Sequence, residues 1–312
     1  MANTIADKLT YLNGTKDAIK QAIIGKGVDV TDTDTFRSYA DKISSIQTGG
    51  SIAGIPSGIK FANSTFTTVP VEIFPYLEQQ TDLTGIFESC KSLTTVSQFD
   101  TSNVTDMSSM FNGCTSLQTV PLFNTSNVTD MGSMFRDCTS LQTVPLFDTS
   151  NVTNMASMFS LCTLLQTVPL FNTSKVTNMA YMFSDCTSLQ TVPQFDTSKV
   201  TNMITMFYGC TSLQTVPLFD TSNVTNMAYI FDGCTSLTNL GGIIGLKDSI
   251  FLNQSTLLTV DSVMNIINYA EDISSSGSSN IIYIHPDVFS KLTEEHIATA
   301  TAKGWKIASY ER

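Results

Sequence analysis

The chain has 312 residues, and 27 acidic against 16 basic side chains give it a net charge of −11. Recognition of a nucleic-acid backbone requires clustered Lys and Arg, so this composition argues against a nucleic-acid partner. No stretch approaches the roughly 18 consecutive apolar residues of a membrane helix, so we expect no membrane span.

Residues 1–48 are predicted to form a small helical module. Apolar residues recur at spacings of four and three in a first helix over residues 3–24, which is the pattern of a narrow, heptad-like seam. The seam consists of Ile5, Leu9, Leu12, Ile19 and Ile23. We expect these residues to mediate self-association or anchoring; the alternative is that they pack only on a second helix over 35–46 of the same chain. Residues 49–57 then read as a linker.

Seven cysteines follow at intervals of 24 residues, from Cys90 to Cys234. A fixed period of this length indicates a repeat array, because each unit must cover the apolar face of its neighbour. The pattern predicts one solenoid over residues 58–240, beginning with an N-terminal cap repeat. One cysteine per repeat at an identical position predicts a ladder of buried free thiols rather than disulfides or a metal site.

Each repeat is predicted to contain a short helix and a strand. Met107, Met110, Phe111 and Cys114 stand at i, i+3, i+4 and i+7, which is one face of a two-turn helix, and Thr105 would cap it. A short strand is expected from Leu117 to Val120, ending before a proline that lacks a donor. The fold class is therefore α/β, a strand-plus-short-helix solenoid with inward-facing Met, Phe, Cys, Leu and Val.

Residues 241–312 are predicted to form a C-terminal α/β cap. A helix is expected over 260–271, a strand over 281–285, and a second helix capped by Thr293 that ends near Gly304. The N-terminal segment, residues 1–11, is polar and lacks the apolar core of a secretory signal. We therefore expect synthesis and folding in a reducing cytoplasm.

The repeat phrase resembles the BspA-like leucine-rich repeats of surface proteins. The resemblance is carried by residues 99–107, by Met110-Phe111 and by residues 114–117, and it extends over about residues 58–240. It implies a curved, right-handed solenoid of strand-plus-helix coils and an association with adhesion. The segments 292–295 and 303–305 resemble the region that often follows such repeats.

Residues 32–37 and 39–43 resemble the N-termini of bacteriophage tail and fibre proteins. This second resemblance implies a non-enzymatic virion protein, a tail or head fibre or a baseplate component, that attaches to a host surface. Residues 1–48 would then contact other virion proteins or form a homo-oligomer, with a trimer favoured because phage fibres are commonly trimeric. The alternative is a BspA-like adhesin located at the bacterial cell surface.

No catalytic residue, metal site or cofactor is predicted. His285 and His296 lack an evident nucleophile nearby, and no paired carboxylates of a glycosidase stand outside the repeats. Asp100 and its equivalents interchange with Asn, which favours turn capping over calcium binding. Candidate recognition residues for a host protein or glycan are those that differ between repeats, with exposed aromatics foremost. They are Tyr181, Ile204, Tyr208 and Tyr229.

Overall fold

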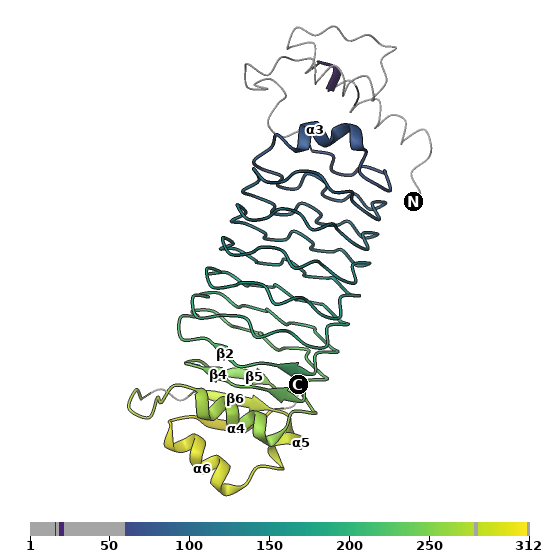
Figure 1. Ribbon diagram of the computed structural model, residues 1–312. Helices are drawn as coiled ribbons and strands as arrows, with labels where there is room; N and C mark the ends of the chain where they lie inside the picture. The colour runs from purple at the N-terminus through teal and green to yellow at the C-terminus, as the bar shows by residue number, and fades with distance from the viewer. Residues whose placement is uncertain (1–15, 17–18, 22–59, 278–279, 311–312) are drawn as a thin grey trace.

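The computed structural model describes residues 16, 19–21, 60–277 and 280–310. From residue 60 onward the chain winds into coils that stack on one another in an elongated array (Figure 1). Parallel bridges join equivalent positions of successive coils, such as Asp106 to Asp130 and Asp130 to Asn154. The predicted repeat solenoid is confirmed.

The expected helical module falls mostly outside the described residues. Ile5, Leu9, Leu12 and Ile23 lie outside them, as does the linker over 49–57, whereas Ile19 is helical and half-buried. Self-association or anchoring through this seam therefore stays a prediction.

The expected two-turn helix in each repeat is wrong. The backbone between Met107 and Cys114 runs through successive turns instead, with Ser109 and Gly113 in the left-handed region at φ 55° and 74°. Alternate peptide N–H groups donate to the next coil, for example from Phe111 to the carbonyl oxygen of Met134 at 2.9 Å. A helix would direct these donors along its own axis, and one this short is unstable alone. The hydrogen bonds between coils satisfy the backbone instead.

The expected strand over Leu117–Val120 is shortened to a single β-bridge. Thr119 forms a single parallel bridge to Thr95, and within the described coils a regular strand pair at this position appears only at the end of the array. The proline that follows supplies no donor, and its carbonyl accepts the N–H of Phe123 at 3.0 Å in a tight turn. The continuous column of bridges lies instead at Asp106 and its equivalents.

Two columns of phenylalanine fill the centre of the coils. Phe111, Phe135 and Phe159 stack with ring centroids 5.8 Å apart and interplanar angles of 7–8°. The second column, which includes Phe123 and Phe171, packs beside the first at 6.2 Å. Offset stacking at these distances adds a contribution to each coil interface beyond the burial of area. The predicted inward placement of Met, Phe, Cys and Leu is confirmed.

All seven cysteines are buried and unpaired, as predicted. Each thiol donates to the carbonyl oxygen of a phenylalanine in the preceding coil, for example Cys162 to Phe135 at 3.1 Å. Burial raises the pKa of the Cys138, Cys186 and Cys234 thiols well above the ordinary value. The sulfur thus fills a small apolar site and also pairs a backbone carbonyl.

We expect the folded protein to resist thiol reagents. Only the thiolate reacts; burial shields all seven thiols from the reagent, and the raised pKa of Cys138, Cys186 and Cys234 suppresses their thiolates further. Incubation with Ellman's reagent at pH 8 should modify fewer than one thiol per chain within the time in which all seven react in guanidinium chloride. Rapid modification of several thiols in the native protein would contradict the stacked core.

Regular elements lie at both ends of the array. At the first described coil, the 3₁₀ turn η1 (Val71–Ile73) leads into α3 (Phe74–Leu77). At the other end, β1 (Thr215–Val216) pairs with β3 (Asn239–Leu240), and β2 (Phe219–Asp220) pairs with β4 (Ile243–Ile244). Both pairs are parallel, so the geometry of the coils persists through β4.

The C-terminal region packs three helices around a parallel sheet (Figure 1). The sheet has the order β5 (Ile250–Leu252), β6 (Ile281–Ile284), β7 (Lys306–Ser309), and the helices are α4 (Val260–Tyr269), α5 (Pro286–Phe289) and α6 (Glu294–Ala302). The helix, strand and second helix expected from the sequence are present as α4, β6 and α6. Lys303 ties α4 to α6, because its ammonium donates to the Ile267 carbonyl at 2.8 Å and to the Ala270 carbonyl at 2.6 Å.

Candidate recognition surface

The three tyrosines singled out by the sequence lie exposed on three neighbouring coils. The side chains of Tyr181, Tyr208 and Tyr229 are 43%, 42% and 53% exposed. The fourth candidate, Ile204, is half-buried. The Tyr181 N–H donates to the Ile204 carbonyl at 2.9 Å, so these two candidates meet across one coil interface. The structure therefore presents aromatic side chains on a backbone held by regular hydrogen bonds.

Tyr181 and Tyr229 occupy the same position of the repeat as Ser109. All three residues are left-handed, with φ of 58° for the tyrosines and 55° for the serine. Thr205 stands at this position between the two tyrosines, with φ 50°. Its hydroxyl is buried and has no hydrogen-bond partner among the described residues. A left-handed β-branched residue is strained, and such strain clusters at functional sites.

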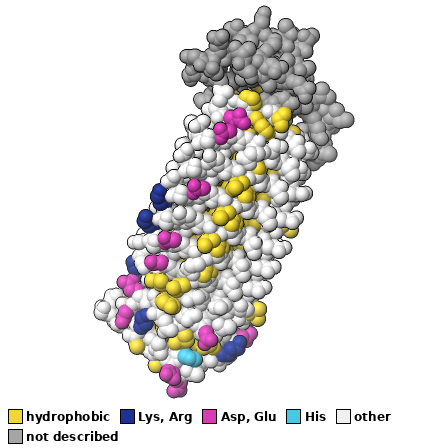
Figure 2. Space-filling model, viewed as in Figure 1, with side chains coloured by type: hydrophobic (Ala, Val, Ile, Leu, Met, Phe, Trp, Pro, Cys, Tyr) yellow, Lys and Arg dark blue, Asp and Glu magenta, His cyan; other side chains and the backbone are white. Residues whose placement is uncertain are grey.

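A column of exposed leucines is a second apolar surface that the sequence reasoning missed. Leu122, Leu146 and Leu170 follow the proline in three successive coils and are 58–60% exposed. Figure 2 shows hydrophobic side chains gathered in a lengthwise band on one face of the array. The sequence contains a signal for this leucine column, because the residue directly before an inward-facing Phe must point outward in an extended segment. Gln98 and Gln194 occupy the same position in other coils.

The carboxylate ladder caps turns, as predicted. The Asp100 carboxylate accepts the Ser102 N–H at 2.8 Å, and the Asn124 carboxamide oxygen accepts the Ser126 N–H at 3.2 Å. This shared bond explains why Asp and Asn interchange here. The hydrogen bonds from Ser102 hold the pKa of Asp100 below its ordinary value.

Both histidines cap helix starts. His285 Nδ1 accepts the Asp287 N–H at 3.1 Å, and His296 Nδ1 accepts the Thr293 N–H at 3.1 Å. The Thr293 hydroxyl reciprocates by accepting the His296 N–H, which completes a capping box. These imidazoles therefore have structural roles.

The described part of the chain contains no group of three or more His, Cys, Asp or Glu side chains placed to hold a metal ion. Among the helices of that part, none has the length and apolar character needed to cross a bilayer.

Comparisons with known proteins give one family match. The family described as "Mycoplasma protein of unknown function, DUF285" matches residues 81–191 and 142–241, which together span more than half of the chain. No curated protein matches the sequence.

Several solved structures of repeat proteins are similar to parts of the chain. A leucine-rich repeat protein of T. pallidum is 24% identical over 58% of this chain and 79% of that one, with a TM-score of 0.40. A leucine rich cell surface protein from Faecalibacterium prausnitzii A2-165 is 24% identical over 52% of this chain and 36% of that one, with a TM-score of 0.31. A leucine-rich repeat protein from Bacteroides ovatus ATCC 8483 is 13% identical over 73% and 86%, with a TM-score of 0.19.

Proposed function

The chain belongs to the DUF285 family, and from that premise we propose that it is a non-enzymatic, adhesin-like repeat protein of the bacterial cell surface. The observation that carries this proposal is the exposure of Tyr181, Tyr208 and Tyr229 on neighbouring coils of the array. Tyrosine is enriched at recognition surfaces because it offers a large, rigid and amphipathic contact area.

The architecture suits recognition more than catalysis. The hydroxyls, amides and thiols of the repeat largely form hydrogen bonds between coils. For example, the Thr149 hydroxyl donates to the Asn172 carbonyl at 2.9 Å. Variation between coils includes partly exposed positions such as Tyr208, where Asn112 and Arg136 stand in other coils. A repeat scaffold of this kind holds its backbone constant and changes only the side chains that it presents.

The sequence resemblance to BspA-like repeats supports the cell-surface setting. The virion role and its docking through residues 1–48 have no supporting finding and stay a prediction. The same holds for a homo-oligomeric, trimeric stalk formed by these residues. Surface labelling of intact cells that express the chain should detect it, whereas its recovery in purified phage particles would favour the virion role instead.

A cell-binding assay tests the recognition surface. We expect the fluorescently labelled full chain to bind host cells, and Tyr181→Ser combined with Tyr208→Asn to weaken that binding at least about tenfold. Both substitutions install residues found at these positions in other coils, so the fold should be retained.

The leucine column supplies the matched comparison. Leu122→Gln and Leu146→Gln also install a residue from other coils, on a different exposed position. Unchanged binding of this variant supports the tyrosine assignment. Loss of binding in the leucine variant alone would move recognition to the leucine column, and failure of the unaltered chain to bind cells would refute the adhesin proposal.

A further inference from the structure

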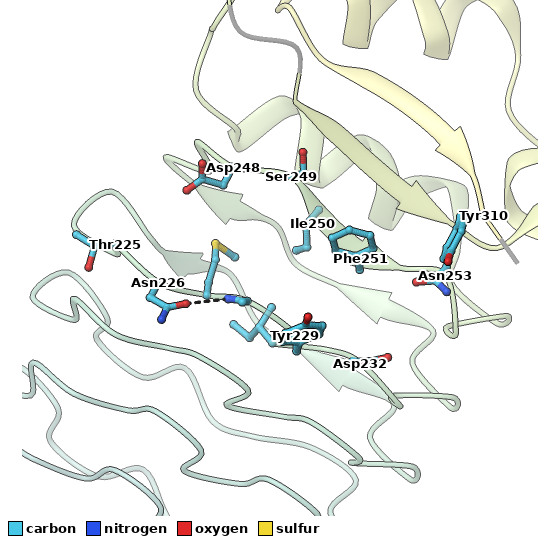
Figure 3. Close-up of a pocket in the computed structure, with 13 residues that line it drawn as sticks. Thr225, Asn226, Tyr229, Asp232, Asp248, Ser249, Ile250, Phe251, Asn253 and Tyr310 are labelled. Atoms are coloured by element: carbon cyan, nitrogen blue, oxygen red, sulfur yellow. Dashed lines mark hydrogen bonds between the residues drawn. The ribbon is translucent and has the colours of Figure 1, made fainter. Parts of the chain in front are cut away.

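A cavity of about 460 Å³ lies where the last coil meets the C-terminal sheet (Figure 3). Residues 225–230 and 232 of the coil form one wall. Residues 248–251 and 253, together with Tyr310 just after β7, form the other. The volume falls within the ~300–1,000 Å³ range of sites for small molecules.

Three exposed aromatic side chains contribute apolar surface to this cavity. Tyr229, Phe251 and Tyr310 line it and are 42–53% exposed. Tyr283 supports two of them, because it stacks on Phe251 with centroids 4.5 Å apart and contacts Tyr310 edge-on at 6.0 Å. Tyr283 therefore helps to hold Phe251 and Tyr310 in place before any ligand arrives, which lowers the entropic cost of binding.

Asn253 is a polar side chain of the cavity wall that is available to a ligand. It lines the cavity and is only 6% exposed, yet no hydrogen bond joins its carboxamide to another side chain or backbone group of the described residues. Figure 3 draws it with Tyr310 among the residues that line the cavity. Its carboxamide offers two donors and one acceptor to a ligand in the cavity. A ligand hydroxyl both donates and accepts, so it can pair with either end.

The charge of the lining selects against anionic ligands. Among the described residues, Asp232 and Asp248 are the charged side chains of the lining and no Lys or Arg contributes to it, which disfavours phosphates and acidic sugars. The Asp232 carboxylate also accepts a hydrogen bond from the Gln254 amide. A donor-only cation would leave the two amide donors of Asn253 unpaired. The chemistry that fits is a neutral, polyhydroxylated ring with an apolar face.

We propose that this cavity binds a neutral saccharide of one or two rings. The apolar face of a sugar ring packs on Tyr229 or Phe251, and its hydroxyl groups bond to the Asn253 carboxamide and the Asp248 carboxylate. The inference rests on the proposed recognition role and names a ligand class for one part of that surface.

Saturation-transfer NMR on the full chain tests the proposal. The probes are glucose, galactose, mannose, N-acetylglucosamine and their disaccharides, with choline chloride as a cationic probe and sialic acid as an anionic one. We expect at least one neutral sugar to bind, and Asn253→Ala or Tyr229→Ser to weaken it at least about tenfold. Tyr269→Ser, which removes an exposed tyrosine of α4 outside the lining, should leave the affinity unchanged.

Asn253→Asp separates sugar from cation binding. It keeps the shape of the side chain but replaces two donors with a charge, so it should weaken a bound sugar, whereas a cation site would bind choline more tightly in this variant. The fluorescence of Trp305, which is the single tryptophan of the chain and is buried, verifies that each variant folds. Binding of choline that Asn253→Asp strengthens, or no binding of any neutral sugar, would overturn the proposal. If the cavity binds no sugar, cell binding that depends on Tyr181 and Tyr208 can still be observed. The saccharide proposal and the adhesin proposal can therefore be refuted independently.

Discussion

Replacing Phe159 with alanine should lower the free energy of unfolding by about 3–5 kcal/mol, the range for truncating a buried phenylalanine. Phe159 is fully buried and stacks between Phe135 at 5.8 Å and Phe183 at 5.7 Å. It also packs against Phe171 of the second column at 6.2 Å. Since each coil contacts only its neighbours, one truncation weakens two coil interfaces at once.

Guanidinium denaturation followed by circular dichroism measures this loss. Leu146→Gln is the control, because Leu146 is exposed and Gln occupies its position in other coils; its effect should stay within about 0.5 kcal/mol. Trp305 fluorescence reports separately on the C-terminal region. A loss of less than about 1 kcal/mol for Phe159→Ala would mean that the column contributes little to the stack.

Removing one whole coil should leave a folded protein, whereas removing half a coil should not. Deletion of residues 151–174 joins Ser150 to Lys175 and restores the repeat phrase across the junction. The donors of the preceding coil then find equivalent acceptors, since the carbonyl of Met182 takes the place of Met158 in bonding the Phe135 N–H. The shortened array keeps every type of contact and loses one interface.

Deletion of residues 151–162 removes acceptors without replacing them. The N–H groups of Met131, Ser133, Phe135 and Asp137 donate to carbonyls that all lie within this segment. Each buried donor left unpaired costs about 1–3 kcal/mol, so four exceed the stability that a small interface can supply. Circular dichroism and limited proteolysis compare the two deletions. Equal resistance of both proteins to protease would refute the coil-by-coil stacking.

The sequence by itself determined the repeat and the composition of the core. Cysteines every 24 residues place one identical unit per coil, and apolar residues at fixed positions must then face the shared interior. Exchanges between Asp and Asn at Asp100 and its equivalents likewise indicated turn capping, because both side chains accept the same N–H. These features follow from periodicity and side-chain chemistry, which a single sequence displays.

The tertiary structure decided the path of the backbone. The spacing of Met107, Phe111 and Cys114 suits a helix, but it suits a run of turns equally well, since both bring those side chains to one face. The choice depends on where the N–H groups find acceptors, and the adjacent coil supplies them. The cavity depends on the fold in the same way. Tyr229, Phe251 and Tyr310 are distant in sequence, and only the packing of the last coil against the C-terminal sheet brings them and Asn253 to one site.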